Sequence, residues 1–196
     1  RIGNPKELAD RLIEEPVHLI DNDGSGRGPR HFIIYNPPIT DPSLGLRKSS
    51  LLEGVRLAQD LINSNVQSVV FARSRRSVEI ILRYIQGDLT PDSSPESPLI
   101  DYKSLPSPQS MVRGYRSGYL PTQRREIEKG LREGTIKTVV ATNALELGID
   151  IGGLGAAILV GYPGTVASAR QQAGRPRRGL ESAAAGMVAS ASPLDQ

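Results

Sequence analysis

The sequence contains no cysteine among its 196 residues, so it offers no disulfide bond, no thiolate nucleophile and no cysteine-ligated zinc. Its two histidines, His18 and His31, lack the neighbouring carboxylate spacing of a metal site. A resident metal and Ser-His-Asp catalysis are therefore not expected. Aromatic residues make up 4% of the chain and tryptophan is absent, which argues against a surface that stacks successive bases of a single strand. Contacts with a nucleic acid would then be made mainly to its phosphate backbone.

Long apolar runs are lacking as well. No unbroken apolar stretch reaches the roughly 18 residues of a membrane span, and residues Arg1–Pro5 contain no apolar signal core. A hydrophobic content of 38%, a charged content of 23% and a net charge of +3 are typical of a folded globular chain. We therefore expect a soluble protein of the cytoplasm or nucleus, folded as a single domain over residues 1–196, with no membrane partner.

Short apolar runs alternate with helical patterns along the chain. The middle runs are rich in valine and isoleucine at consecutive positions, which is typical of parallel strands buried on both faces. Strand alternating with helix predicts an α/β fold, a mostly parallel central sheet with helices on both faces. The expected strands are 31–36, 67–72, 111–115, 136–142, 156–161 and 186–190, and the expected helices are 5–15, 47–63, 74–86, 121–132 and 166–172.

Local residues mark two of these helices. Ser74 follows an expected strand and can cap a helix whose apolar positions recur at three and four residues. Pro121 suits the first turn of a second helix, and Gly134 is suited to close it.

Two polar segments are interpreted as surface features. Residues 87–110 contain five prolines and six serines and form a Pro/Ser-rich surface loop, which we take as a linker rather than a partner-binding insertion. Residues 24–28 are glycine-rich but lack the Lys-Ser/Thr pair of a phosphate-binding loop, so we interpret them as a flexible turn.

Three segments place polar groups just beyond an expected strand, where open α/β sheets bind ligands. The first contains Arg73, Ser74 and Arg75 at the start of a helix, whose free N–H groups together with these side chains can hold a phosphate. The alternative is a solvated helix start.

The second segment joins Thr142 and Asn143 to Gly148 and Asp150. A buried strand brings the first two residues to the sheet edge, and the glycine lets the backbone turn to present the carboxylate. The hydroxyl can bind a phosphate, and the carboxylate can bind a ribose or an arginine. Asp150 as an ordinary cap or surface acid is the alternative.

The third segment is a dense arginine cluster. No acidic residue occurs from Ile151 to Leu180, whereas residues 170–178 contain Arg170, Arg175, Arg177 and Arg178. A cluster of one sign without neutralising acids is suited to bind an anion, and guanidinium groups match phosphate oxygens bidentately. A basic solvated tail is the alternative.

Taken together, these segments resemble the second RecA-like lobe of superfamily 2 DNA and RNA helicases. Residues 68–75 (SVVFARSR) are similar to motif IV, residues 115–132 to motif IVa, residues 139–150 (VVATNALELGID) to motif V, and residues 171–178 (QQAGRPRR) to motif VI. The four motifs occur in the right order. The resemblance implies a three-layer RecA-like P-loop NTPase fold.

Finer features resemble the Hrq-type and mitomycin-repair subgroup of DEAD/DEAH-box DNA helicases. They are the opening Ile2–Pro5, the segments 15–20 and 36–38, and the ending 188–196. Members are ATP-dependent translocases that run 3′→5′ on single-stranded DNA and often carry a cysteine-rich, zinc-binding C-terminal region. The resemblance implies single-stranded DNA, or a duplex with an overhang, as partner.

Walker A, the DExH acid and the SAT segment belong to the first lobe of such enzymes, and none occurs in this sequence. ATP and Mg²⁺ would be bound mainly through that first lobe of the same chain. We therefore expect this chain to be a fragment of a larger helicase that is inactive as an ATPase alone. A cysteine-rich C-terminal domain is an expected further partner.

By position, the resemblance implies that Gly148 and Asp150 meet the nucleotide, and that Gln171 and Arg175 face the γ-phosphate. The residues implied on the nucleic-acid side are Arg73, Ser74, Arg75, Arg116, Gly118, Thr142 and Asn143. Motif VI departs from its usual form at Pro176 and Arg177, so either Arg177 or Arg178 can be the second arginine of the catalytic set. An RNA helicase lobe and a non-catalytic nucleic-acid-binding module are the alternative functions.

Overall fold

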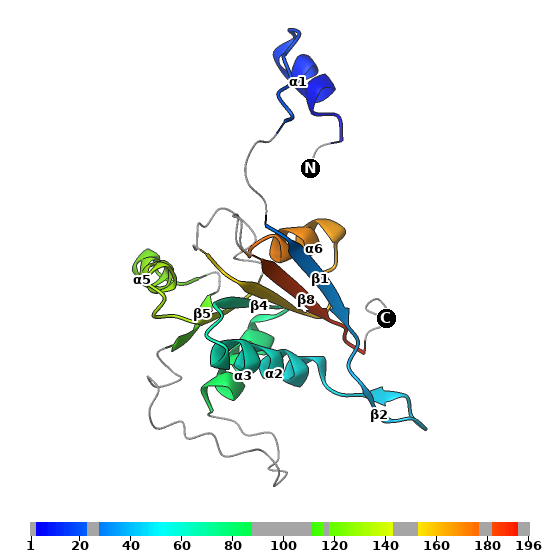
Figure 1. The fold of residues 1–196 in the computed structure, drawn as a ribbon, viewed down its shortest axis with the longest axis vertical. Coiled ribbons are helices and arrows are strands. Elements are labelled where there is room, and N and C mark those ends of the chain that lie inside the picture. Colours follow the sequence, from blue (N-terminus) through cyan, green and yellow to red (C-terminus); the bar gives the residue numbers. More distant parts are fainter. Residues whose placement is uncertain are drawn as a thin grey trace.

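The computed structural model describes residues 3–22, 28–87, 111–115, 118–142, 153–176 and 182–191. Within them, six strands form one sheet in the order β1-β8-β7-β4-β6-β5, and every neighbouring pair is parallel (Figure 1). The strands are β1 Arg30–Tyr35, β4 Ser68–Ala72, β5 Val112–Tyr115, β6 Thr138–Ala141, β7 Ala156–Val160 and β8 Ala183–Val188. The predicted α/β fold with a parallel central sheet is confirmed.

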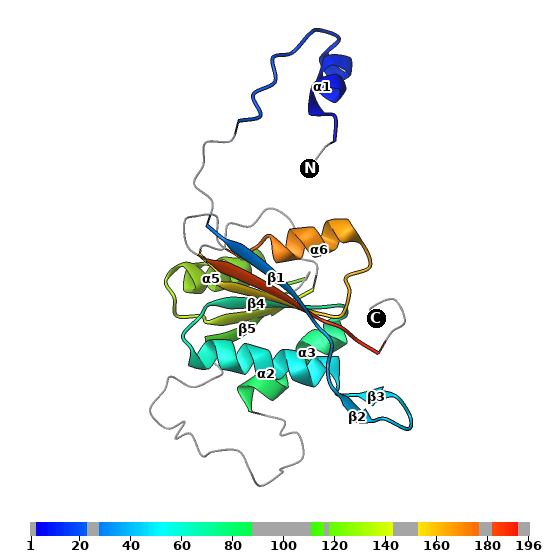
Figure 2. The same cartoon turned by 45° about the vertical axis from the view of Figure 1, so that its right-hand side comes forward.

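Helices cover both faces of this sheet (Figure 2). On one face lie α2 Ser50–Asn63 and α3 Arg75–Gln86, and on the other lie α5 Pro121–Arg132 and α6 Val166–Ala173. In β4, Val70 packs toward the first pair of helices and Val69 toward the second, and both are fully buried. The central strands are thus buried on both faces, as their continuous apolar runs predict.

The predicted signals of α3 and α5 are present. Ser74 Oγ accepts a 3.0 Å hydrogen bond from the Ser77 N–H and caps α3. Pro121 begins α5, and Gly134 follows it with φ +74°. Gln123 Oε1 accepts a 3.2 Å bond from the Leu120 N–H.

Two predicted boundaries differ from the observed ones by three residues. The helix expected from residue 47 begins at Ser50, because Leu46–Arg47 (β3) pairs with Ile39–Asp41 (β2) in an antiparallel hairpin that precedes it. The last strand begins at Ala183 rather than at residue 186. Alanine has a weak strand propensity, so pairing with β1 and β7 determines this start.

The N-terminal helix α1 (Pro5–Ile13) does not join the core. None of its residues is buried, and Figure 1 shows it separated from the sheet. Leu8, Leu12 and Ile13 are exposed on it. The Val17 N–H donates a 2.7 Å hydrogen bond to Asp10 Oδ1, which fastens the following segment to the helix.

Candidate nucleic-acid and nucleotide sites

All six strands are parallel, so the residues that follow them gather at one edge of the sheet. Arg73 and Ser74 follow β4, and Thr142 follows β6. Phe71 pairs with Ala141, which places Thr142 beside the end of β4. The structure therefore brings together these three predicted nucleic-acid residues.

Their surroundings differ. Arg73 is exposed, whereas Thr142 is 9% exposed. Ser74 Oγ lies 2.8 Å from Ser77 Oγ in addition to capping α3, so this hydroxyl is already engaged within the chain. Arg75 is the first residue of α3 and is also exposed. The predicted cation-rich helix start is therefore present next to the sheet edge.

Gly118 lies between β5 and α5 with φ +99°, a backbone conformation that favours glycine. Nearby, the Arg124 guanidinium is 5.9 Å from the centroid of the Tyr115 ring, and Tyr115 Oη donates a 3.5 Å hydrogen bond to Glu128. Burial, followed by the charge of Glu128, raises the pKa of Tyr115. This phenol therefore stays protonated and serves to hold α5 against the sheet.

A cavity of about 280 Å³ opens between the ends of β4 and β7. The segment 161–164 forms one wall, and no sequence motif singled it out. The residues that line the cavity are Phe71, Ala72, Arg73, Val160, Gly161, Tyr162, Pro163, Gly164, Ser168 and Gln172. The signal that could have found it is a Gly-Tyr-Pro-Gly segment directly after a buried strand, at the same sheet edge as Arg73.

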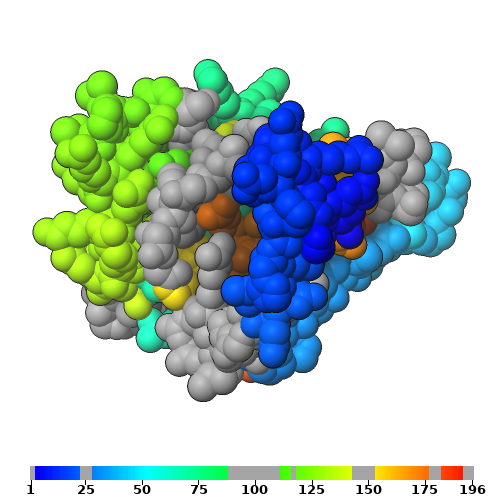
Figure 3. Space-filling model, turned by 90° about the horizontal axis from the view of Figure 1, so that it is seen from above, coloured from blue at the N-terminus to red at the C-terminus, as the bar shows by residue number. Residues whose placement is uncertain are grey.

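The first residues of motif VI lie elsewhere, on α6. Gln171 is exposed and, together with Arg170 and two residues of the first turn, lines an open cavity of about 730 Å³. Seen from above, α6 is visible in a hollow between α5 and the N-terminal segment (Figure 3). That volume falls within the range of about 300–1,000 Å³ typical of small-molecule sites.

Arg175 follows α6 and is half-buried. Its N–H donates a 3.2 Å hydrogen bond to the Gln172 carbonyl, and the Gly174 N–H donates a 2.9 Å bond to the Arg170 carbonyl. A Cβ atom on Gly174 would lie 2.9 Å from that carbonyl oxygen. Glycine is therefore needed at this position to keep the turn that sets Arg175.

Six predicted site residues lie outside the described part of the chain: Arg116, Asn143, Gly148, Asp150, Arg177 and Arg178. The predicted loop 87–110 is described only at Gly87, which ends α3. Among the described residues, no group of three histidine, aspartate or glutamate side chains is arranged to hold a metal ion. No helix in the described ranges is long and apolar enough to cross a membrane.

Residues 53–179 match the helicase conserved C-terminal domain, and because this match covers more than half of the chain, the chain belongs to that family. It is the C-terminal, RecA-like lobe of a superfamily 2 helicase of the YprA, MrfA and Hrq1 type. The uncharacterized ATP-dependent helicase YprA of Bacillus subtilis is 48% identical over 195 residues, which cover 100% of this chain and 24% of YprA. The ATP-dependent helicase HRQ1 of Saccharomyces cerevisiae is 36% identical over 191 residues, 97% of this chain and 17% of HRQ1.

Solved structures agree with this assignment. The DUF1998 helicase MrfA bound to DNA is 47% identical and superimposes with a TM-score of 0.83, over 100% of this chain and 24% of that one. MrfA bound to DNA and AMPPNP gives a TM-score of 0.82. The chain thus spans about a quarter or less of the length of these relatives.

Proposed function

We propose that this chain is the second motor lobe of an ATP-dependent DNA helicase or translocase that moves 3′→5′ on single-stranded DNA and acts in DNA repair. It would supply the arginine finger and contacts to the phosphate backbone. The proposal is supported by relatives that are named ATP-dependent helicases and by a relative whose structure holds DNA.

One observation carries the proposal. Polar and cationic side chains lie at the end of β4 and also on and just after α6, and the unit of β7, its following loop and α6 connects these two places. Arg73 lies where β4 ends, beside the loop that follows β7, and Gln171 and Arg175 lie at the other end of the helix that this loop begins. A rigid unit of this kind can transmit a change at the nucleotide to the nucleic acid.

At the first place, exposed Arg73 would bind a phosphate, with Ser74, Arg75 and Thr142 beside it. Arg116, Gly118 and Asn143 would extend the same surface. Such contacts do not distinguish bases, so binding should tolerate sequence changes and weaken steeply with salt.

At the second place, the open cavity on α6, lined by Arg170 and Gln171 among others, suits the triphosphate of ATP. Gln171 and Arg175 would face the γ-phosphate with Arg177 or Arg178, while Gly148 and Asp150 would meet the nucleotide. A guanidinium group there stabilises negative charge on the phosphoryl oxygens. We propose that Mg²⁺ is held mainly by the first RecA-like lobe of the full-length chain.

Lobe closure would then follow from differential contacts. With ATP present, Arg175 attracts the γ-phosphate held by the first lobe, and after hydrolysis this attraction is lost. Each cycle would shift the phosphate contacts of Arg73 relative to those of the first lobe.

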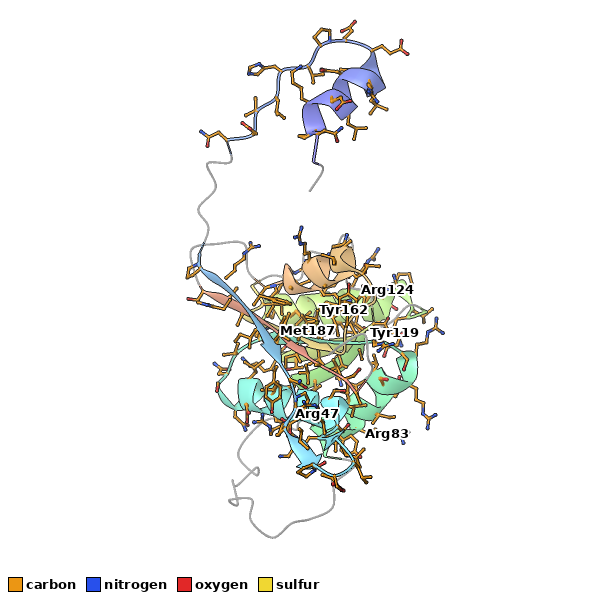
Figure 4. The ribbon with its side chains drawn as sticks, turned by 90° about the vertical axis from the view of Figure 1, so that its right-hand side faces the viewer. Arg47, Arg83, Tyr119, Arg124, Tyr162 and Met187 are labelled. Carbon is orange, nitrogen blue, oxygen red and sulfur yellow. The ribbon has the colours of Figure 1, made fainter. Side chains whose placement is uncertain are left out.

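The test uses the full-length enzyme with Arg175→Ala, Arg177→Ala and Arg178→Ala, each assayed for DNA-stimulated ATP hydrolysis. An arginine finger contributes about 10³–10⁵ in rate, so at least one variant should lose most of its activity. Arg83→Ala is the matched control, because Arg83 is an exposed arginine on α3, across the sheet from α6 (Figure 4). Activity near that of the control in all three variants would contradict the role.

Unwinding assays on matched DNA and RNA duplexes with a 3′ overhang test the nucleic-acid preference. Faster unwinding of the DNA duplex is expected, and preference for RNA would favour the RNA helicase alternative. In the full-length protein, an upstream GKT and DExH support the motor, and their absence would favour a non-catalytic module.

A further inference from the structure

The cavity between β4 and β7 lies at the point where the chain connections reverse direction. The two strands are neighbours, and Ala72 pairs with Val160 at their ends. From β4 the chain passes to α3 on one face, and from β7 it passes to α6 on the opposite face. Open α/β sheets bind ligands in the crevice outside the strand ends at such a switch point.

The cavity wall includes two buried apolar residues, one from each strand. Phe71 and Val160 are 3% and 8% exposed. The loop after β7 is fixed by a 2.9 Å hydrogen bond from the Gly161 N–H to the Val188 carbonyl. Gly161 and Gly164 have φ values of +81° and +91°, a backbone conformation that residues with a side chain rarely adopt. The cavity is therefore part of the folded framework and does not depend on a surface side chain.

Polar residues also belong to the lining. Gln172, 5% exposed, and Ser168 are among the lining residues. Tyr162 adds an aromatic ring beside α6 (Figure 4). The cation among the lining residues is Arg73, which is exposed.

We propose that this cavity is a subsite for one unstacked nucleobase of the bound strand, with Arg73 on an adjacent phosphate. The inference rests on the proposed DNA-binding function and adds a base contact to its phosphate contacts. A volume of about 280 Å³ lies just below the range of about 300–1,000 Å³ for whole small molecules. It therefore suits one flat ring system and not a complete nucleotide.

The lining favours a base over a phosphate. A phosphate needs N–H donors or cations around it, whereas Phe71, Val160 and Pro163 are apolar and Tyr162 is aromatic. Base stacking on an aromatic residue tolerates every base. The subsite would therefore recognise that a base is present without selecting its identity.

The experiment measures the affinity of the full-length enzyme, with a non-hydrolysable ATP analogue, for a duplex carrying a 3′ tail of thymidines. A single abasic position is moved along the tail. An abasic position keeps its phosphate, so it separates a base contact from a backbone contact. Loss of one stacked base should weaken binding by about five-fold to somewhat over a hundred-fold, and we expect this at one tail position that depends on the cavity.

Ser168→Leu fills the cavity without removing a charge or the backbone N–H that donates to Thr165. In this variant the abasic penalty at that position should disappear. Ser64→Leu makes the same change at an exposed site just after α2 and should keep the penalty. If Ser168→Leu does not fold, the abasic scan of the unmodified enzyme still tests the subsite.

A scan in which every position changes affinity by less than two-fold would overturn the subsite, as would an unchanged penalty in folded Ser168→Leu. If the enzyme binds the tail with strong salt dependence in that case, the phosphate-binding function survives and only the base subsite fails. If the enzyme does not bind DNA, both fail together.

Discussion

Tyr35 Oη donates a 2.8 Å hydrogen bond to Glu53 Oε2 and thereby joins the end of the edge strand β1 to the first turn of α2. Glu53 is 6% exposed, and Arg56 Nη2 lies 3.1 Å from the same oxygen. Burial acts to raise the pKa of Glu53, but the hydrogen bonds from Tyr35 and Arg56, with the charges of Arg56 and Lys48, outweigh it and lower that pKa. The buried carboxylate is therefore ionised in the folded protein.

Glu53→Gln should lower the free energy of unfolding of the chain by about 1–3 kcal/mol near neutral pH, because hydrogen bonds to a charged group are lost. A lowered pKa contributes stability above the unfolded-state value, and this stability is lost as the pH falls through the folded-state value. The difference between the variant and the parent chain should thus shrink below about pH 4.5. Urea denaturation at pH 7 and pH 3 measures the loss of unfolding free energy at neutral pH and its decrease in acid.

The matched control for this variant is Asp60→Asn. Asp60 also pairs with Arg56, at 3.3 Å, but its side chain is 61% exposed. Exposed ion pairs contribute little, so the unfolding free energy should change by less than about 1 kcal/mol. Equal effects of the two variants at pH 7 would show that burial of Glu53 does not matter.

Ser74→Ala tests the cap of α3. The variant removes the acceptor of the Ser77 N–H and should lower the free energy of unfolding by about 1 kcal/mol. Thermal unfolding measures it, and Ser64→Ala is the control, because at this C-cap of α2 the backbone N–H, which the variant keeps, donates to the Asp60 carbonyl. An unchanged transition temperature in Ser74→Ala would mean that solvent satisfies this N–H equally well.

Much of the sheet follows from local pattern. β4 and β6 each contain two consecutive valines and β7 contains Ile158, Leu159 and Val160 in succession, and burial on both faces explains these consecutive apolar positions. The start of β8 does not follow from the local sequence pattern, because pairing with β1 and β7 determines where this strand begins. The hairpin of β2 and β3 is also too short to show an alternating pattern.

The candidate sites likewise contain some residues that the sequence predicts and others that it does not. Arg73 and Gln171 stand out in the sequence because they lie in recognisable motifs. The wall formed by residues 161–164 becomes part of a site only because β7 pairs with β4, a contact between distant parts of the chain. Local sequence carries no signal for such a pairing.

Gly174→Ala is expected to impair the proposed nucleotide site while leaving most of the fold intact. The added Cβ would lie 2.9 Å from the Arg170 carbonyl oxygen, so the end of α6 must shift and move Arg175. Because a small misplacement at a catalytic group can reduce rates about 10²-fold, DNA-stimulated ATP hydrolysis by the full-length enzyme should fall markedly. Ala173→Gly, one residue earlier, is the control for changes in helix stability. A variant that keeps full activity would show that Arg175 needs no fixed position.

The isolated 196-residue chain should not hydrolyse ATP, because the first lobe is proposed to hold Mg²⁺ and to make most of the contacts with ATP. Phosphate release is measured with the purified chain alone and after addition of the separately produced first lobe. Turnover that is proportional to the concentration of the chain, and that survives further purification, would contradict the expected division of labour.

Arg73→Gln should weaken DNA binding by the full-length enzyme and also change its salt dependence. Each neutralised phosphate contributes about 0.9 to the slope of log affinity against log salt concentration on duplex DNA, and about 0.7 on a single strand. Loss of one such contact should reduce the slope by nearly that amount, equally for thymidine and mixed-sequence tails, because phosphates carry no base identity. Titrations at several salt concentrations measure the slope. Arg83→Gln removes the same charge from the exposed surface of α3 and should leave it almost unchanged. Equal slopes for Arg73→Gln and Arg83→Gln would place the phosphate contacts away from the end of β4.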